Sequence, residues 1–166
     1  MKSSKVLYKK HYEIFADYHQ FYLMDADKNP YAPEDWTNED VWRRVKAEKY
    51  IIVIRPERNM TVPVDLEIAD SEPQEDFENW HHVAEASLDL SSGKLGIEKC
   101  TGNEPVDEII LPPNTYRVRA YYGDLDKLSF DGLEGDDHYK IVLWQAPFED
   151  VKVLKQFEGN NNFNSF

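Results

Sequence analysis

Residues 60–68 read Met-Thr-Val-Pro-Val-Asp-Leu-Glu-Ile, and this pattern indicates the class of fold. Apolar and acidic side chains alternate in it, with Val62, Val64, Leu66 and Ile68 at one parity and Asp65 and Glu67 at the other. Because successive side chains of a β-strand point to opposite faces, the alternation predicts a strand with one buried and one charged face. Pro63 lacks the N–H that a ladder hydrogen bond needs, so it predicts an edge strand or a bulge.

Strand patterns continue on both sides of this stretch. Residues 50–54, Tyr-Ile-Ile-Val-Ile, form an apolar run that stops before Pro56, which is typical of a strand buried on both faces. Residues 83–90 and 95–97 predict a hairpin around Ser-Ser-Gly-Lys at 91–94. Further alternating or apolar stretches predict strands near residues 12–16, 18–24, 106–111, 116–121, 139–144 and 151–154.

One helix is predicted, in the first third of the chain. Thr37 is a favourable N-cap, and Asp40 stands three residues later, where an acid completes a capping box. The apolar residues that follow, up to Val45, have the spacing of one helix face, so we expect the helix to run to about Lys49.

These elements predict a mainly β protein: an antiparallel β-sandwich of about eight or nine strands with one short helix in the N-terminal third. A parallel sheet is disfavoured because helices do not alternate with the strands. The length of 166 residues suits one domain, which we place at residues 1–157. Residues 158–166 are rich in Asn and are expected to form a disordered tail.

The chain lacks the sequence marks of export and membrane insertion. No stretch approaches the roughly 20 apolar residues that span a bilayer, and the N-terminus has no apolar core of a secretory signal. Cys100 is the single cysteine, so an internal disulfide is excluded. We therefore expect a cytoplasmic protein in a reducing compartment.

Negative charge dominates the composition. Asp and Glu number 32 against 19 Lys and Arg, for a formal net charge of −13. Nucleic acid and anionic membranes attract positive charge and are thus disfavoured as partners. The balance suits a cationic protein partner, or serves solubility alone. The acids are clustered: residues 59–93 hold nine acids and no Lys or Arg, and residues 124–137 hold six against Lys127.

Two patterns were tested for a metal site. An EF-hand alignment of the loop that begins at Asp124 fails, because Leu128, Ser129 and Gly135 occupy positions that need a ligand, a glycine and a glutamate. His81 and His82 are adjacent on a predicted strand, so their side chains should point to opposite faces, which is a poor arrangement for joint metal binding.

Enzyme motifs are missing as well. The sequence contains neither a G-x-S-x-G nucleophile elbow nor a glycine-rich phosphate loop. We therefore predict no catalytic residue, no cofactor and no metal. A metal-assisted hydrolase that uses His19, His81 or His82 with carboxylates remains an alternative.

The candidate partner-binding residues are mostly acids of the two clusters. Acids two positions apart on one face of an extended strand lie about 6.6 Å apart, close to the phosphate spacing of a nucleic-acid strand. An acidic face could therefore occupy a basic cleft in place of nucleic acid. The acidic candidates are Asp65, Glu67, Asp70, Asp124, Asp126, Asp131, Glu134, Asp136 and Asp137. Two candidates come from the aromatic stretch, Tyr18 and His19, whereas Phe21 and Trp36 are expected in the core.

Two short motifs carry a resemblance to a known family. Tyr-His-Gln-Phe at 18–21 and Asp-Trp-Thr-Asn-Glu at 35–39, in this order and with a Pro-containing loop between them, resemble the competence protein J (ComJ) family of small acidic bacterial proteins. The turn at 111–116, Leu-Pro-Pro-Asn-Thr-Tyr, is similar too. The resemblance implies inhibition of a DNA-degrading nuclease by direct binding, with no catalytic residues.

The chain departs from that family by its greater length, with acidic insertions at 71–79 and 124–137. Residues 82–88, 93–95, 116–119 and 143–144 look like a broader set of uncharacterised bacterial proteins, which implies no activity. The sequence thus predicts an acidic protein-binding module similar to a nuclease inhibitor. The alternative is a β-sandwich that binds a sugar or another small molecule.

Overall fold

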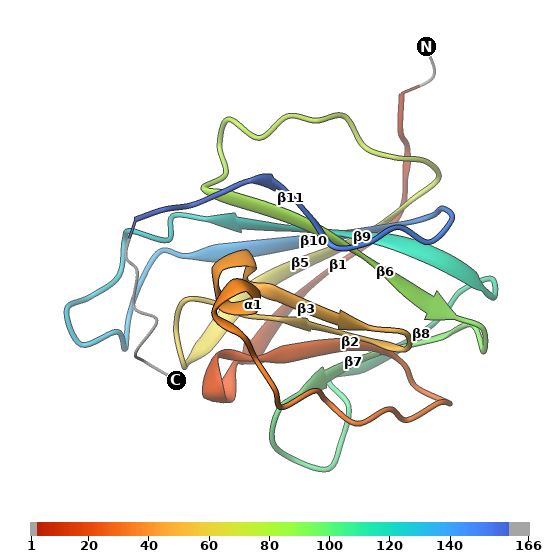
Figure 1. The fold of residues 1–166 in the computed structure, drawn as a ribbon, viewed down its shortest axis with the longest axis horizontal. Coiled ribbons are helices and arrows are strands. Elements are labelled where there is room, and N and C mark those ends of the chain that lie inside the picture. The colour runs from red at the N-terminus through yellow and green to blue at the C-terminus, as the bar shows by residue number, and fades with distance from the viewer. Residues whose placement is uncertain (1–2, 160–166) are drawn as a thin grey trace.

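The computed structural model describes residues 3–159 as two β-sheets packed face to face, with one short α-helix (Figure 1). The larger, six-stranded sheet has the strand order β1 (Val6–Phe15), β5 (Thr61–Ala69), β10 (His138–Gln145), β9 (Asn114–Gly123), β6 (His82–Leu90) and β11 (Lys152–Lys155). The smaller, five-stranded sheet has the order β3 (Val45–Glu48), β4 (Ile51–Ile54), β2 (Phe21–Asp25), β7 (Lys94–Lys99) and β8 (Asp107–Ile110). The helices are a 3₁₀ turn, η1 (Asp17–His19), and α1 (Asn38–Arg43).

The prediction of a mainly β, mostly antiparallel protein is confirmed. The structure has eleven strands within the described residues, more than the eight or nine expected, partly because β3 lies where the helix was predicted to continue. One pair departs from the antiparallel rule: β10 runs parallel to β5, from Tyr139 opposite Val64 to Leu143 opposite Ile68. Residues 160–166 of the predicted Asn-rich tail lie outside the described residues.

The alternation in β5 is confirmed, but the expectation for Pro63 is wrong. β5 lies between β1 and β10 and is therefore not an edge strand. Its register against β1 runs without a shift around Pro63, which faces Glu13, so there is no bulge there either. Pairing with β10 begins only at Val64, so Pro63 precedes that ladder and its missing N–H costs it no hydrogen bond.

The predicted helix begins as expected and ends early. The Thr37 hydroxyl accepts from the Asp40 N–H at 3.1 Å, and the Asp40 carboxylate accepts from the Thr37 N–H at 3.0 Å, which completes the capping box. Arg44 then adopts a left-handed conformation, with φ 61°, and the chain turns directly into β3. The expected extension to Lys49 is therefore wrong.

The main core fills the space between the two sheets. It takes the inward faces of β1, β5, β6, β9 and β10 on one side and of β2, β4 and β7 on the other. Phe21, fully buried, belongs to it as expected. Trp36 does not: it is half-buried and packs on a smaller apolar cluster around Tyr22 and Met24, on the outer face of the smaller sheet.

A second outer cluster shapes the surface of the larger sheet. The loop of residues 70–81 crosses that sheet, and its Phe77 and Trp80 pack on Tyr121, with ring centroids 6.1 and 5.3 Å apart (Figure 1). One acidic segment is thus fixed to the sheet by aromatic contacts. Within residues 3–159, no helix is long and apolar enough to cross a membrane.

Candidate functional site

The two acids of β5 lie on the outer face of the larger sheet, as predicted, but each has a basic neighbour. Asp65 Oδ1 lies 2.8 Å from Nδ1 of His11, and Glu67 lies 3.7 Å from Nζ of Lys140. The carboxylates of Asp65 and Glu13 accept hydrogen bonds from the His11 ring, and this raises the pKa of His11. Charge on these strands is therefore locally balanced, and Asp65 and Glu67 do not form a bare negative strip.

Asp70 lies at the end of β5, apart from the other acidic candidates. Its carboxylate accepts the Lys5 N–H at 2.8 Å and the Ser71 hydroxyl at 3.1 Å. These bonds hold the N-terminal end of β1 against the start of the 70–81 loop. Asp70 thus connects these two segments and does not add to the acidic surface that Asp65 and Glu67 were predicted to form.

The loop 124–137 is ordered and presents acids to solvent. Asp131 accepts the Ser129 hydroxyl at 2.6 Å and the Leu133 N–H at 3.1 Å, and these bonds lower its pKa. A β-bridge between Leu128 and Gly135 closes the base of the tip. Four of the predicted acids are exposed on this loop: Asp126, Asp131, Glu134 and Asp136.

Apolar side chains stand among these acids. Phe130 is fully exposed, and Leu133 is 54% exposed. Contiguous exposed apolar side chains rimmed by polar residues are found at protein-binding surfaces, so Phe130 and Leu133 are candidates for a contact surface. The sequence analysis did not single out Phe130 and Leu133, although their position inside an acidic loop was visible.

Two predicted acids of this segment behave differently. Asp124, half-buried, lies 3.3 Å from Lys127 Nζ. Asp137 is 1% exposed: it accepts from Nε of Arg58 at 2.5 Å and from the Tyr139 hydroxyl at 2.6 Å. Asp137 is therefore a buried anchor of the loop and lies outside the exposed acidic surface.

Tyr18 and His19 lie in the turn η1, in an uncommon backbone conformation. Their φ angles are 57° and 58°, in the left-handed region that non-glycine residues seldom occupy. Asn59 holds the turn by accepting the Tyr18 N–H at 2.8 Å. Such strain persists where the surroundings impose it and is frequent at binding sites. The turn directs the two side chains into different cavities.

His19 enters a cavity of about 510 Å³, named here the polar cavity. Its other walls are the segment 57–59 and the loop residues Asp126 and 128–133. The fold thus brings His19 together with Asp126 and Asp131, which are more than a hundred positions away in the sequence. Burial, with a contribution from Arg55, lowers the pKa of His19, so this side chain is neutral at pH 7.

Tyr18 enters a second cavity, of about 650 Å³, named here the aromatic cavity. It is lined by Tyr18, Gln20, Tyr22, Tyr31, Ala32, Pro33, Glu34, Trp36 and Cys100. Tyr18 and Tyr31 are both exposed, at 62% and 95%. The aromatic and the polar cavity flank the same turn, so Tyr18 and His19 separate an apolar pocket from an acidic one.

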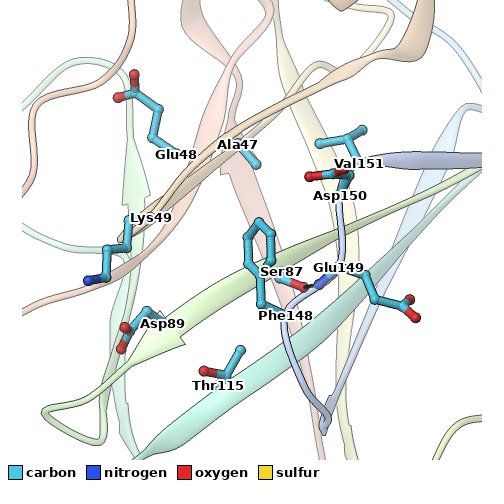
Figure 2. Close-up of a pocket in the computed structure, with 10 residues that line it drawn as sticks. All are labelled: Ala47, Glu48, Lys49, Ser87, Asp89, Thr115, Phe148, Glu149, Asp150 and Val151. Atoms are coloured by element: carbon cyan, nitrogen blue, oxygen red, sulfur yellow. Dashed lines mark hydrogen bonds between the residues drawn. The ribbon is translucent and has the colours of Figure 1, made fainter.

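A third cavity, of about 490 Å³, lies around Phe148 and was not predicted (Figure 2). It is named here the Phe148 cavity, and its lining residues are Ala47, Glu48, Lys49, Ser87, Asp89, Thr115, Phe148, Glu149, Asp150 and Val151. The loop 124–137 lies at one end of the sandwich and the segment 146–151 at the other, so the Phe148 cavity is remote from the polar cavity (Figure 1).

The two adjacent histidines have different hydrogen-bond partners, but both contact Phe157: the His81 ring stacks on the Phe157 ring, with centroids 5.0 Å apart, and His82 accepts the Phe157 N–H. His81 Nδ1 accepts the Leu125 N–H at 3.0 Å, outside the core. His82 is fully buried; its Nε2 donates to the Arg43 carbonyl at 2.7 Å, and its Nδ1 accepts the Phe157 N–H at 3.1 Å. Within residues 3–159, no three His, Cys, Asp or Glu side chains come together in an arrangement that could hold a metal ion.

Buried arginines are the polar feature that the sequence analysis missed. Glu85 accepts from Nε of Arg117 at 3.0 Å and from Nε of Arg119 at 2.6 Å, and all three side chains are buried. Arg119 also lies over the rings of Phe77 and Trp144, 5.6 and 5.1 Å from their centroids. The sequence did contain a signal for this cluster: Arg117 and Arg119 stand at alternate positions of a predicted strand and therefore point to the same face of the sheet.

Comparison with known proteins adds a structural likeness. No protein-family model matches the sequence, and no curated protein matches it significantly. The crystal structure of ComJ from Bacillus subtilis, described as an inhibitor of the DNA-degrading activity of NucA, is similar, with a TM-score of 0.63 at 19% identity over 87% of this chain and 100% of that chain. A structure described as crocagin biosynthetic gene J is similar with a TM-score of 0.55 at 18% identity, over 88% of this chain and 100% of that chain.

Both likenesses extend over the whole of the compared chain, so they concern the complete two-sheet arrangement rather than one motif. The sequence motifs at 18–21 and 35–39 fall on the turn η1 and on the start of α1, which border the aromatic cavity and the core. The predicted resemblance is thus confirmed at the level of the fold: the chain has a ComJ-like fold.

Proposed function

We propose that this protein is a binding module that blocks a DNA-degrading nuclease, or a protein with a similarly basic surface, by charge complementarity. The observation that carries the proposal is the tip of the loop 124–137. There, exposed carboxylates surround the exposed Phe130 and Leu133 on a ComJ-like fold. ComJ is described as an inhibitor of the nuclease NucA, which supports a nuclease as the class of partner. We propose a cytoplasmic setting for this activity.

The proposed contact surface, named here the acidic tip, comprises Asp126, Asp131, Glu134 and Asp136 with Phe130 and Leu133. Interfaces obtain most of their binding energy from a few desolvated anchors, and Phe130 is suited to that part. The carboxylates around it would steer the encounter and exclude partners of like charge. The adjoining turn brings Tyr18 and His19 to the same end of the molecule.

The physical basis of inhibition is competition for a basic cleft. A nuclease holds DNA through cationic side chains that contact phosphates. An acidic tip with an apolar anchor could occupy that cleft while offering the nuclease no phosphodiester bond to cleave. The net charge of −13 supports this by raising the association rate at low salt. Asp65 and Glu67 contribute less, because His11 and Lys140 neutralise them.

The test starts with a pull-down from the source organism's lysate at low ionic strength, followed by DNA-degradation assays on the retained protein. The wild type should inhibit the retained nuclease at equimolar concentration. A Phe130→Ser, Glu134→Lys double variant should lose at least about tenfold in affinity. Glu149→Lys, at the opposite end of the sandwich, is the matched control and should inhibit as well as the wild type. Retention of a protein without a basic cleft, or full inhibition by the double variant, would refute the proposal.

The aromatic cavity favours one second candidate, the binding of a sugar or another small molecule with a flat face. Three tyrosines and Trp36 line it, and Tyr18 and Tyr31 have exposed rings. Stacking on such rings depends little on ionic strength, whereas binding by the acidic tip should weaken steeply from low to moderate salt. A partner that binds equally at both salt concentrations and loses affinity in Tyr31→Ala would favour this candidate.

A further inference from the structure

The Phe148 cavity lies between two strand edges. On one side β3 pairs with β4 alone, so its outer edge, which carries Ala47, is unpaired within the described residues. On the other side β11 pairs with β6 only as far as Glu85, and the rest of β6 continues past the end of β11. The Asp89 N–H donates to the Lys49 carbonyl at 3.0 Å and closes one end of the gap.

The main chain of Ser87 faces this gap but is covered, since Ser87 is only 5% exposed. The N–H of Asp89 points away from β9, and strand geometry gives the residue two positions earlier the same orientation. Ser87 thus turns its N–H and C=O away from β9, between Glu85, which pairs with β11, and Asp89. No strand stands opposite Ser87 on that side within residues 3–159. Among the described residues, the strand edge that remains open here is the outer edge of β3, and an extended peptide is the ligand that pairs with such an edge.

The side chains around the gap define the chemistry of the ligand. Phe148 is 69% exposed, and Figure 2 shows its ring standing between Ala47 and Ser87, with Asp89 and Asp150 on either side in this view. Four carboxylates and one ammonium group line the cavity: Glu48, Asp89, Glu149 and Asp150, and Lys49. The Lys49 ammonium lies over the ring of its neighbour Tyr50, 5.3 Å from the centroid. This rim repels phosphates and anionic lipids and attracts a cation.

The frame of the cavity is rigid although Phe148 is exposed. The Glu149 N–H donates to the Ser87 hydroxyl at 3.0 Å, and Arg117 donates to the carbonyls of Glu149 and Asp150 at 2.8 and 2.9 Å. The Ala146 N–H donates to the Thr115 carbonyl at 3.2 Å, on the other side of Phe148. The segment is thus held on both sides of one exposed aromatic ring, which keeps that ring in position for a ligand at little entropic cost.

We propose that the Phe148 cavity binds an arginine side chain presented by a short extended peptide segment. The guanidinium group stacks on the Phe148 ring and forms hydrogen bonds with the carboxylate of Asp150, which points toward the space above that ring in Figure 2. The peptide main chain pairs with the outer edge of β3. A volume of about 490 Å³ accommodates the arginine and part of its neighbours. Arginine fits better than lysine, because a planar guanidinium group stacks on a ring and binds carboxylates in pairs.

The test is an NMR titration of the ¹⁵N-labelled protein with the blocked peptide acetyl-Thr-Val-Arg-Val-Thr-amide. Saturable shifts should appear at the amides of Ala47, Ser87 and Phe148. The same peptide with neutral citrulline in place of arginine should bind about tenfold more weakly. The peptide comparison uses the unaltered protein, so it does not depend on the folding of a variant.

Two exposed phenylalanines provide a matched pair of variants. Phe148→Ala should lower the affinity of the protein for the arginine peptide about fivefold. Phe130→Ala, at the acidic tip, should leave that affinity unchanged. Equal binding of the citrulline peptide, no saturable shift at millimolar peptide, or shifts confined to residues 124–137 would each overturn the proposal. Because the two sites lie at opposite ends of the sandwich, failure here leaves the proposed nuclease inhibition standing, and the reverse also holds.

Discussion

The guanidinium group of Arg58 and the carboxylate of Asp137 form a buried ion pair, with Nε and Oδ1 2.5 Å apart. Arg58 also donates to the Leu133 carbonyl at 3.3 Å, so one side chain holds both the base and the tip region of the loop 124–137. The second carboxylate oxygen of Asp137 accepts from the Tyr139 hydroxyl, whose oxygen in turn accepts the Glu57 N–H at 2.8 Å. The acidic tip is therefore anchored by the buried hydrogen bonds and ion pair of Arg58, Asp137 and Tyr139.

Removal of the Arg58 charge should destabilise the protein strongly. In Arg58→Met, the Asp137 carboxylate stays buried without its cation, which costs about 3–5 kcal/mol of unfolding free energy. Urea denaturation monitored by tryptophan fluorescence measures the loss. Asp136→Asn, on the exposed neighbour, is the control and should change stability by less than about 0.5 kcal/mol. Equal stabilities of the two variants would show that the ion pair is not a structural anchor.

His82 should make the protein acid-sensitive in a defined range. Burial, with a contribution from Arg44, lowers the pKa of His82 to about 3, from 6.5. Between pH 6.5 and pH 3, His82 therefore binds a proton in the unfolded chain but not in the folded protein. The unfolding free energy consequently falls as the pH falls from 6.5 towards 3. The slope from this group is about 1.4 kcal/mol per pH unit, and the full loss is of the order of 5 kcal/mol.

The control for this prediction is a histidine of opposite behaviour. His82→Gln should flatten the decline in unfolding free energy between pH 6.5 and pH 5, measured by denaturation at a series of pH values. His11→Gln should retain the decline, because hydrogen bonds with Asp65 and Glu13 raise the pKa of His11, and its contribution to stability is lost on raising the pH rather than lowering it. An unchanged pH profile in His82→Gln would refute the assignment.

Local patterns predicted the local structure well. The alternation in β5 and the capping box at Thr37 depend on neighbouring residues, and both are present. The predicted hairpin around residues 91–94 is wrong: the turn joins β6 of the larger sheet to β7 of the smaller sheet, and the two strands do not pair. The helix end failed because propensity favoured a longer helix, whereas Arg44 adopts a left-handed conformation and Val45 enters the core opposite Ile54. Tertiary packing outweighs a difference of a few tenths of a kcal/mol per residue in helix propensity.

The candidate sites were less predictable because each is assembled from distant segments. The polar cavity joins His19 to residues 126–133, and the Phe148 cavity joins the β3–β4 hairpin to β6 and to residues 148–151. Asp137 was predicted to be a surface acid because it is charged. Its burial depends on an ion pair with Arg58, which lies 79 positions earlier in the chain. A single sequence contains no signal that pairs such residues.

Phe130 should matter for partner binding and not for stability. Its side chain is fully exposed, so Phe130→Ser should leave the unfolding free energy within about 0.5 kcal/mol of the wild type. Affinity for the captured partner, measured by calorimetry, should fall by at least about tenfold if Phe130 is an anchor. Phe15→Ser, on another exposed phenylalanine, is a control for unspecific loss of apolar surface and should bind normally. Normal binding by Phe130→Ser would exclude the acidic tip as the contact surface.

Glu85 should stabilise two surface segments at once. Its carboxylate balances Arg117, which holds the carbonyls of Glu149 and Asp150, and Arg119, which donates to the Pro73 carbonyl at 3.0 Å. In Glu85→Gln, the two buried guanidinium groups lose their shared counter-charge, so we expect a loss of about 3 kcal/mol in unfolding free energy.

Hydrogen exchange distinguishes this effect from a uniform loss of stability. Amides of residues 70–81 and 146–151 should exchange faster in Glu85→Gln than the global destabilisation requires, because both segments are held by the arginines that Glu85 balances. Glu72→Gln removes only an exposed partner of Arg119, 3.3 Å away, and should cost less than about 1 kcal/mol. Faster exchange spread evenly over all strands would contradict the local mechanism. It would assign Glu85 to the general stability of the larger sheet.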